Sequence, residues 1–445
     1  MAHLAFLLSL LLSSLSLPAS QPRIGGDARD LCIKDVDFAL DTLEKKCGHF
    51  FELKGIDWNA VGREFRASAK TVKDEREHCG LLIRLLARLR DGHCEVRPVG
   101  KGASIRPPDE LFPQLASAGF TLCRSGGKLY LKSVFGPAAK QGLAPGMEVA
   151  KIGKLSAADW IAQREEEMRD VTSYSTEQQA FYSACNWGPM LARGTKLEIE
   201  ASGAKGKKLT KSLDCGVSDV PLVGPAFPPK KLEGSPPIVW GLTKQGFGYL
   251  WLSKCPQDLP ARIDPALEEL ADAPGLIVDF RGNAGGAFDH EDFLGRFLPK
   301  GSTLSGGKGY ESTGAHPYGG PVVVLIDAGV RSAGESAAGI FKEDGRGWLI
   351  GESPTAGMSS SKETIELPSG LFALYVSVAS NKGRFNGGKG IEGIGVPPSE
   401  VVEYEPEDLA QGIDTLLRVA EERLMKFPQD KVRYDPAKAG WKAKK

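Results

Sequence analysis

The sequence predicts a multidomain α+β protein in which a helical region, a region of short strands and an α/β core follow one another. Apolar residues repeat at spacings of three and four between residues 27 and 90, which indicates helices. Short apolar segments separated by turn residues fill residues 115–215. Strand-like and helix-like segments alternate from about residue 236. A chain of 445 residues is long enough for several such domains, each with its own core.

The first residues have the pattern of a secretory signal. The apolar stretch from Leu4 to Leu17 is too short to span a bilayer, and small residues follow it. We therefore expect residues 1–20 to be a signal peptide that is cleaved near Ala19 or Ser20. No later run is apolar enough for a membrane helix, so no integral membrane segment is expected after signal removal. The expected destination is the periplasm, the cell surface or the medium.

The charge balance and the cysteine spacing argue against a nucleic-acid partner and against a metal site. The 56 basic residues balance the 56 acidic ones, so nothing indicates a nucleic-acid partner. Eight cysteines are an even number, which permits disulfides in an exported protein, and their pairing stays open. None of them has the spacing of a zinc site, so no metal is expected.

The helical region is expected to cover residues 21–110. Two segments carry the helical spacing, "DVDFALDTLEKKCGHFF" and "HCGLLIRLLARLRDG". Asp91 and Gly92 form a helix stop, and "HCEVRPV" after them is typical of an extended segment.

Strands are expected next, over residues 111–217. The strand segments are "GFTLCR", "KLYLKSVF", "MEVAKIG" and "KLEIEAS", and a long insert separates the last two. The Pro-rich residues 218–237 are typical of a linker.

An α/β core is expected over residues 238–405. Its apolar runs do not alternate with polar residues, which indicates strands covered on both faces, and we include "LFALYVSVA" (371–379) among them. Residues 406–427 are expected to form one amphipathic helix, and residues 406–445 to be this helix with a basic tail.

A serine follows one buried strand of this core. The strand "PVVVLID" is followed by "GVRSAGESAAGIF", where a helix is expected to begin. The serines here could simply cap the helix. Alternatively, a serine at a helix N-terminus, beside backbone N–H groups and the positive end of the dipole, is placed as a nucleophile.

Five segments decide between these alternatives, because together and in this order they resemble the C-terminal processing (tail-specific) serine peptidases. They are "DGHCEV", the segment "GPAAKQGLAPGMEVAKIG", "GLIVDFRGNAGG", "VVVLIDAGVRSAGESAAGIF" and "GKGIEGIGVPPSEVV". The resemblance covers roughly residues 85–405 and is closest to the tricorn-core-like branch, which uses a Ser/His/Glu site instead of Ser/Lys. It implies a PDZ-like domain at residues 111–217 and a ClpP/crotonase-like catalytic core.

The resemblance also assigns roles to individual residues. "RSAGE" is similar to the nucleophile segment of the family, which makes Ser332 the nucleophile. Ser336 would lie one helical turn further on, facing the packed side. The N–H of Ala333 and that of Gly285 or Gly286 would form the oxyanion hole, since glycine lets the backbone approach a tetrahedral oxyanion closely.

The base differs from that of many family members. Met358 stands where they carry a lysine, and a thioether cannot accept the serine proton. Lys362 follows four residues later, at a position that matches a glutamine-like one. The resemblance makes His93 the general base, as suits a group that titrates near neutral pH. It makes Glu392 the carboxylate that orients or charge-stabilises the histidine.

The segment "AGFTL" is similar to the carboxylate-binding loop of a PDZ domain, so Gly119, Phe120 and Thr121 are candidates for peptide binding. Asp279 and Arg281, by contrast, are expected to be architectural. The function expected is an exported serine endopeptidase that acts on polypeptides without a cofactor. The alternative is a catalytically inactive protein that binds a peptide or small ligand on the same fold.

Overall fold

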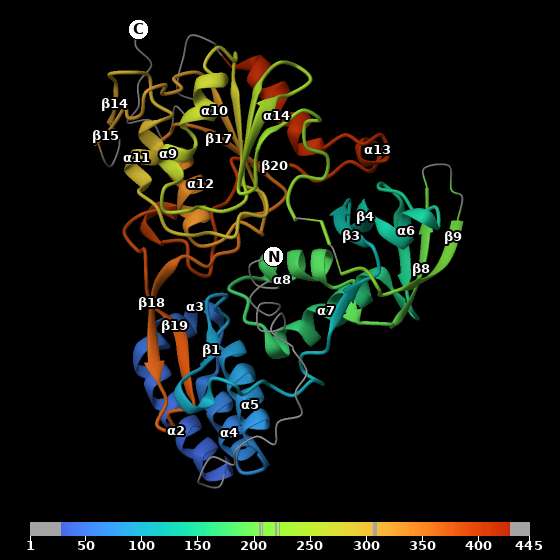
Figure 1. Cartoon of the computed structure of the whole chain (residues 1–445), viewed down its shortest axis with the longest axis vertical. Helices are drawn as coiled ribbons and strands as arrows, with labels where there is room; N and C mark the ends of the chain where they lie inside the picture. The colour runs from blue at the N-terminus through green and yellow to red at the C-terminus, as the bar shows by residue number, and fades with distance from the viewer. Residues whose placement is uncertain are drawn as a thin grey trace. The chain divides into compact units, whose positions relative to one another are not determined.

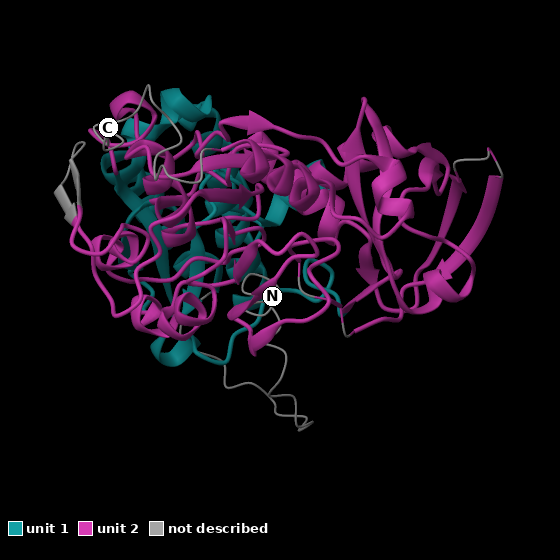
Figure 2. Cartoon of the chain, turned by 90° about the horizontal axis from the view of Figure 1, so that it is seen from above, with its two compact units in different colours: residues 1–114, 166–175, 360–380 teal, residues 115–165, 176–359, 381–445 magenta. Residues whose placement is uncertain are grey.

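The computed structural model describes residues 28–427 apart from residues 204, 205, 207, 219, 222 and 306–308. The expected signal peptide and basic tail lie outside the described residues. The chain forms two compact units (Figure 2). Unit 1 comprises the residues up to 114 with 166–175 and 360–380, and unit 2 comprises 115–165, 176–359 and 381 onward. Five peptide bonds therefore join the units, after residues 114, 165, 175, 359 and 380.

Two helices of unit 1, α4 and α5, begin where an aspartate accepts from one of their first N–H groups. Asp57 accepts from the N–H of Ala60, and Asp74 accepts from the N–H of Glu77. The apolar sides of the helices pack in one core with residues of a small sheet. The helices are α2 (Ala28–Cys47), α3 (Phe51–Lys54), α4 (Trp58–Ala69) and α5 (Glu75–Ala87), with short 3-10 turns η1 (Gly48–Phe50) and η2 (Gly100–Gly102).

The sheet of unit 1 has three antiparallel strands in the order β1, β19, β18 (Figure 1). The prediction that assigned residues 371–379 to the α/β core was wrong, because these residues pair with Glu95–Pro98 and with the strand just before them. A short turn suffices to join two antiparallel strands, whereas a parallel neighbour needs a long crossover. The strands are β1 (Glu95–Pro98), β18 (Ser360–Glu366) and β19 (Phe372–Ser380).

Unit 2 is built on a seven-stranded sheet, in the order β10, β11, β12, β13, β16, β17, β20. The strands from β12 to β20 are parallel, and the first three pair antiparallel. All five residues of β16 are fully buried, as expected of a strand covered on both faces. The strands are β10 (Glu233–Ser235), β11 (Ile238–Leu242), β12 (Gly248–Leu252), β13 (Leu276–Asp279), β16 (Val322–Ile326), β17 (Trp348–Gly351) and β20 (Glu400–Val401).

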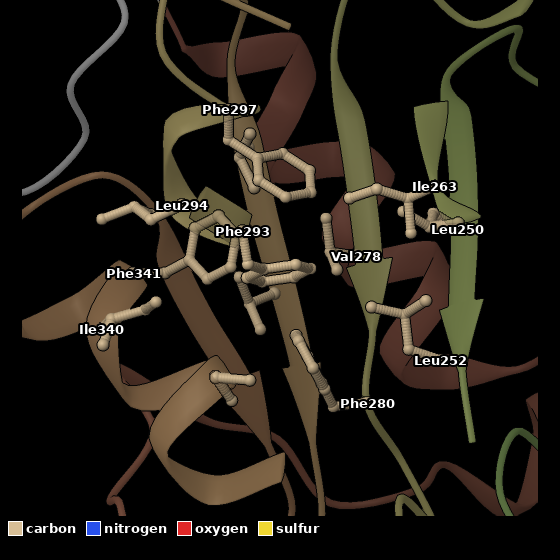
Figure 3. Packing of buried hydrophobic residues seen from close by; sticks show 14 of the residues in the cluster. Leu250, Leu252, Ile263, Val278, Phe280, Phe293, Leu294, Phe297, Ile340 and Phe341 are labelled. Atoms are coloured by element: carbon tan, nitrogen blue, oxygen red, sulfur yellow. The ribbon is translucent and has the colours of Figure 1, made fainter. Parts of the chain in front are cut away.

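Aromatic side chains fill the space between this sheet and the helices on one face (Figure 3). Phe297 lies edge-on to both Phe293 and Phe341, with ring centroids 5.1 and 5.0 Å apart. Helix α14 packs on the opposite face. The helices here are α9 (Leu259–Arg262), α10 (Asp264–Glu269), α11 (His290–Gly295), α12 (Ala333–Glu343), α13 (Pro406–Ala410) and α14 (Thr415–Lys426), and a hairpin joins β14 (Thr303–Ser305) to β15 (Gly309–Glu311).

The C-terminal segment forms two helices, so the prediction of a single helix over residues 406–427 was wrong. Gly412 has φ 70°, a left-handed conformation that ends α13. Asp414 then accepts from the N–H of Leu417 and starts α14. Apolar residues keep a helical spacing across both helices, so the break at Gly412 was not visible in the sequence. None of the helices in the described residues is long and apolar enough to be a membrane span.

A second sheet of unit 2 is antiparallel, in the order β3, β4, β5, β8, β9, with β6 beside β5. The predicted strand segments between residues 119 and 202 all lie in it, and the long insert forms helices, one of which, α8, lies against β3. Strands β2 and β7 pair with each other in a separate sheet, and helix α7 continues from unit 2 into unit 1 at residue 166. The elements of this part of the chain are β2 (Leu115–Ser117), β3 (Phe120–Ser125), β4 (Lys128–Val134), α6 (Gly136–Lys140), β5 (Glu148–Ile152), β6 (Leu155–Ser156), α7 (Ala157–Val171), α8 (Glu177–Trp187), β7 (Met190–Ala192), β8 (Lys196–Ser202) and β9 (Lys208–Asp214).

Candidate active site

Ser332 lies in unit 2, at the point where β16 leads into helix α12. It precedes the first helical residue, Ala333, and is half-buried. Its backbone has φ 53° and ψ −125°, which a non-glycine residue adopts only when its surroundings hold it there. The N–H of Ser332 donates to the carbonyl of Met358 and to the carboxylate of Glu335, both at 3.1 Å. Ser332 and Glu335 form a capping box for α12. Capping alone does not require strain, and strained positions cluster at functional sites, so the conformation favours a chemical role in addition to capping.

A glycine turn packs directly against Ser332. Gly285 has φ 79°, and a Cβ atom there would lie 2.8 Å from the Cβ of Ser332. A Cβ on Gly286 would overlap the carbonyl oxygen of Cys255. Both positions therefore require glycine, because no larger residue leaves this approach open.

Two backbone donors beside Ser332 are available to a ligand. The N–H of Gly285 donates to Oδ1 of Asn283 at 2.8 Å, so this donor is already engaged. Among the described residues, neither Gly286 nor Ala333 has a hydrogen-bond acceptor for its N–H. Of the two glycines that the sequence left open, Gly286 is thus the one whose N–H is available to a ligand.

Asn283 and Asp327 fix the turn and the serine loop. Asn283 is fully buried, and its amide donates to the carbonyl of Leu252 at 2.6 Å. Oδ1 of Asp327 accepts from the N–H of Gly282 at 3.0 Å and from that of Gly329 at 2.9 Å. One carboxylate therefore holds the start of the glycine turn and the loop before Ser332 together.

Glu335 is a residue of the site to which the sequence analysis gave no role. It is fully buried, and besides the N–H of Ser332 its carboxylate accepts from Thr355 Oγ1 and from the N–H groups of Gly357 and Met358, at 2.6, 2.7 and 2.8 Å. Burial raises the pKa of Glu335 to about 7, although these hydrogen bonds act to lower it. The glutamate in "RSAGE" was visible, but its partners lie about twenty residues away in the sequence.

Met358 occupies the position at which the resemblance expects a lysine. Its Sδ accepts a hydrogen bond from Nε2 of Gln179 at 3.0 Å, and its side chain is buried. Lys362 is half-buried on β18 in unit 1. Neither the Met358 thioether nor any other atom of its side chain can take a proton from a serine.

Glu392 lies in unit 2 and is 1% exposed. The N–H of the next residue, Gly393, donates to the carbonyl of Gly357 at 2.7 Å. The N–H of Gly357 donates to Glu335. Gly357 is therefore hydrogen-bonded both to the loop of Glu392 and to the glutamate that binds the N–H of Ser332.

His93 lies in unit 1, between α5 and β1, with an imidazole that is 9% exposed. Its Nδ1 is 3.6 Å from Oδ1 of Asp91, which also accepts from the N–H of His93 at 3.0 Å. Burial acts to raise the pKa of Asp91, but the interactions with His93 and the charge of Lys54 outweigh it and hold the pKa well below its usual range. Asp91 is thus the carboxylate beside His93 within unit 1, and the sequence analysis used it only as a helix stop.

The candidate peptide-binding residues lie at the start of β3, an edge strand of the second sheet. Gly119 has φ 95°, and its N–H donates to Oγ of Ser117 at 3.0 Å. Phe120 is fully buried and Thr121 is 7% exposed. Arg281, predicted to be architectural, is fully buried and is paired with Asp279 at 2.7 Å.

Comparison with known proteins shows that part of the chain is similar to a family of peptidases. Residues 246–402 match the model of peptidase family S41. The chain is 30% identical over 189 residues to a chloroplastic C-terminal processing peptidase of Tetradesmus obliquus, covering 40% of this chain and 39% of the relative. It is 27% identical over 304 residues to the carboxy-terminal processing protease CtpB of Bacillus subtilis, covering 64% of this chain and 55% of the relative. The chain thus spans about half the length of these curated relatives, or less.

The fold extends the similarity to nearly the whole chain. The crystal structure of mature CPAF superposes with a TM-score of 0.65 and 12% identity, covering 90% of this chain and 97% of that one. CPAF complexed with lactacystin gives a TM-score of 0.64, also at 12% identity, with coverage of 90% and 98%. These matches show that residues 246–402 are similar to peptidase family S41 and that the fold of nearly the whole chain is similar to that of CPAF.

Proposed function

We propose that this protein is an exported serine endopeptidase in which Ser332 is the nucleophile and His93 the general base. The observation that carries the proposal is the position of Ser332, a strained residue at the start of α12 beside the available N–H groups of Ala333 and Gly286. A helix capped for stability alone does not need a strained serine, since a serine caps a helix with ordinary extended backbone.

The reaction would proceed through an acyl-enzyme. Oγ of Ser332 attacks the peptide carbonyl while Nε2 of His93 accepts its proton. The N–H groups of Ala333 and Gly286 stabilise the oxyanion, and each such donor is worth roughly 3 kcal/mol of barrier. His93 then gives the proton to the leaving amine, and a water molecule that His93 deprotonates releases the acyl group. No cofactor takes part.

Two consecutive residues, one in each unit, support the loop of His93 and the loop of Met358. The N–H of Gly92, next to His93, donates to Oγ of Ser175 at 3.0 Å within unit 1. The next residue, Thr176, donates through Oγ1 to the carbonyl of Ala356 at 2.8 Å within unit 2. Ser175, which binds the loop of His93, is therefore joined by a single peptide bond to Thr176, which binds the loop that carries Met358.

Two carboxylates compete for the role of orienting the imidazole. Asp91 supports a direct role, because it is buried and lies 3.6 Å from Nδ1. The resemblance assigns the role to Glu392. Hydrogen bonds of a catalytic group are often long before substrate binds, so the 3.6 Å distance is compatible with orientation by Asp91.

The substrates we propose are polypeptides, as the names of the carboxy-terminal processing relatives suggest. The antiparallel sheet with the edge strand β3 would be the PDZ-like domain, in which Gly119, Phe120 and Thr121 would guide the chain. The second candidate is a non-catalytic binding protein, and the presence of Met358 in place of the family lysine favours it.

A fluorophosphonate probe separates the two candidates. We expect one adduct on the full chain by intact mass, and no adduct on Ser332→Ala or His93→Ala. Ser336→Ala is the matched control, since Ser336 lies one turn further along α12 and its Oγ is 2.8 Å from Nε2 of His290. An adduct that persists in Ser332→Ala would contradict Ser332 as the nucleophile, and no adduct on the wild type would support the binding protein.

A further inference from the structure

A cavity of about 360 Å³ lies within unit 1, and His93 is one of the residues that line it. Residues of helix α5, of strands β1 and β19, and of segments 105–112 and 171–173 line it. Ile83, Leu86, Val96 and Phe112 give it an apolar surface. An apolar cavity of about 150 Å³ is enough to bind benzene, so this one has room for a large aromatic or aliphatic side chain.

The charged side chains that line the cavity make hydrogen bonds to other groups of the protein. Glu95 accepts from Nε of Arg97 at 3.0 Å. Arg106 donates to the carbonyls of Ala103 and Ile105, at 3.2 and 3.0 Å. Because Glu95 and Arg106 already have hydrogen-bond partners, the cavity offers an occupant mainly the burial of apolar surface, which is worth roughly 25 cal/mol per Å².

We propose that this cavity is the subsite for a bulky apolar side chain on the leaving-group side of the scissile bond. The inference rests on the proposed function. The base of a serine peptidase returns its proton to the leaving amine, so the nitrogen of the leaving residue lies against the imidazole. The side chain of that residue branches from the carbon next to this nitrogen. The acyl side of the substrate lies instead at the oxyanion donors, Ala333 and Gly286.

Capture of the acyl-enzyme by added amines tests this directly. An N-acylated amino-acid p-nitrophenyl ester forms the acyl-enzyme on the full chain, and phenylalanine amide or glycine amide then competes with water for it. The ratio of amide product to hydrolysed product does not depend on how fast the acyl-enzyme forms. We expect phenylalanine amide to be favoured over glycine amide about tenfold or more.

A variant that fills the cavity gives the matched comparison. Ile83 lines the cavity and is half-buried, so Ile83→Trp should reduce the preference to about twofold. Leu53→Trp adds the same bulk at a 51% exposed position of unit 1 and should keep the tenfold preference. Should Ile83→Trp fail to fold, Ala87→Leu makes a smaller addition to the same wall.

The experiment distinguishes a failure of the proposed function from a failure of this inference alone. If no acyl-enzyme forms on Ser332, the proposed function and this inference both fail. If it forms but both amides capture it equally, or if Ile83→Trp keeps the tenfold preference, only this inference is overturned. A free apolar molecule retained by the purified protein in native mass spectrometry would likewise overturn it, because the cavity would then hold a ligand rather than a substrate side chain.

Discussion

At the scale of single residues, the carboxylate beside a catalytic imidazole decides which tautomer is present. Asp91 is 4% exposed, and its Oδ2 accepts from the N–H of Ser377 at 3.2 Å while its Oδ1 faces His93. A charged carboxylate here favours a proton on Nδ1 and leaves Nε2 free to accept the proton of a serine. The depressed pKa of Asp91 means that this charge persists at acidic pH.

We therefore expect Asp91→Asn to lower kcat/KM about 100-fold or more at neutral pH and to change the shape of the pH–rate profile, because an amide no longer fixes the tautomer. Glu392→Gln, measured in parallel, shows which carboxylate orients the histidine. A loss in Asp91→Asn that is uniform across pH and accompanied by a lower Tm would contradict an orienting role and indicate a structural one.

At the scale of elements, the glycine turn after β13 packs directly against the start of α12. Gly285 contacts Ser332, and a Cβ on Gly334 would overlap Oδ1 of Asn283. The turn and the helix therefore approach as closely as backbone permits. Displacing reacting groups by a fraction of an ångström in such a site costs rate far more than it costs stability.

Gly285→Ala should lower kcat about 100-fold while lowering the free energy of unfolding by only about 1–2 kcal/mol, since the new methyl group pushes on Ser332. Gly301→Ala is the control, because Gly301 also has a positive φ, 70°, but nothing lies within 4 Å of its Cβ position. Rate constants and thermal unfolding of both variants check the prediction. Equal kcat losses in the two would mean that backbone strain, and not contact with Ser332, is responsible.

At the scale of the whole molecule, a buried charge cluster ties distant segments of unit 2 together. Arg281 pairs with Asp279 and, at 2.8 Å, with Asp414, and all three side chains are at most 2% exposed. Asp414 also accepts from the N–H groups of Ala226 at 2.8 Å and of Leu417 at 3.1 Å. Three regions, the β13 turn, the segment before β10 and helix α14, thus depend on one carboxylate.

Asp414→Asn should lower the free energy of unfolding at pH 7 by about 3–5 kcal/mol, because it leaves Arg281 buried with one partner fewer. Burial acts to raise the pKa of Asp414, but Arg281 outweighs it, so the pKa lies below its usual value. The contribution of Asp414 is therefore present above pH 4, roughly the ordinary pKa, and is lost as the pH falls below it.

Thermal unfolding of the wild type and of Asp414→Asn at pH 7 and pH 3 checks this. We expect the difference in Tm between the two proteins to shrink at pH 3. Glu407→Gln, at an exposed position of α13, should leave the Tm unchanged at both values. A difference that is the same at pH 7 and pH 3 would show that the charge of Asp414 is not what stabilises unit 2.

The sequence by itself determined the strands and helices whose periodicity is local, because spacing of apolar residues is a property of neighbours along the chain. The run "VVVLI" before a helix start left a capping serine and a nucleophile as alternatives, and the resemblance of "RSAGE" and "GNAGG" to a peptidase family selected Ser332 and its oxyanion turn as candidates. The break at Gly412 escaped this reasoning, since the amphipathic spacing continues across it.

Only the tertiary structure decided what depends on pairing between distant segments. Strand β19 could have joined either sheet by its composition. A short turn explains its antiparallel pairing with β18, and its pairing with β1 on the other side is visible only in the structure. The sequence showed Glu335 and Asp91 only as single acidic residues. Their roles come from donors up to 286 residues away, at Ser377, and such long-range hydrogen bonds leave no periodic trace in a sequence.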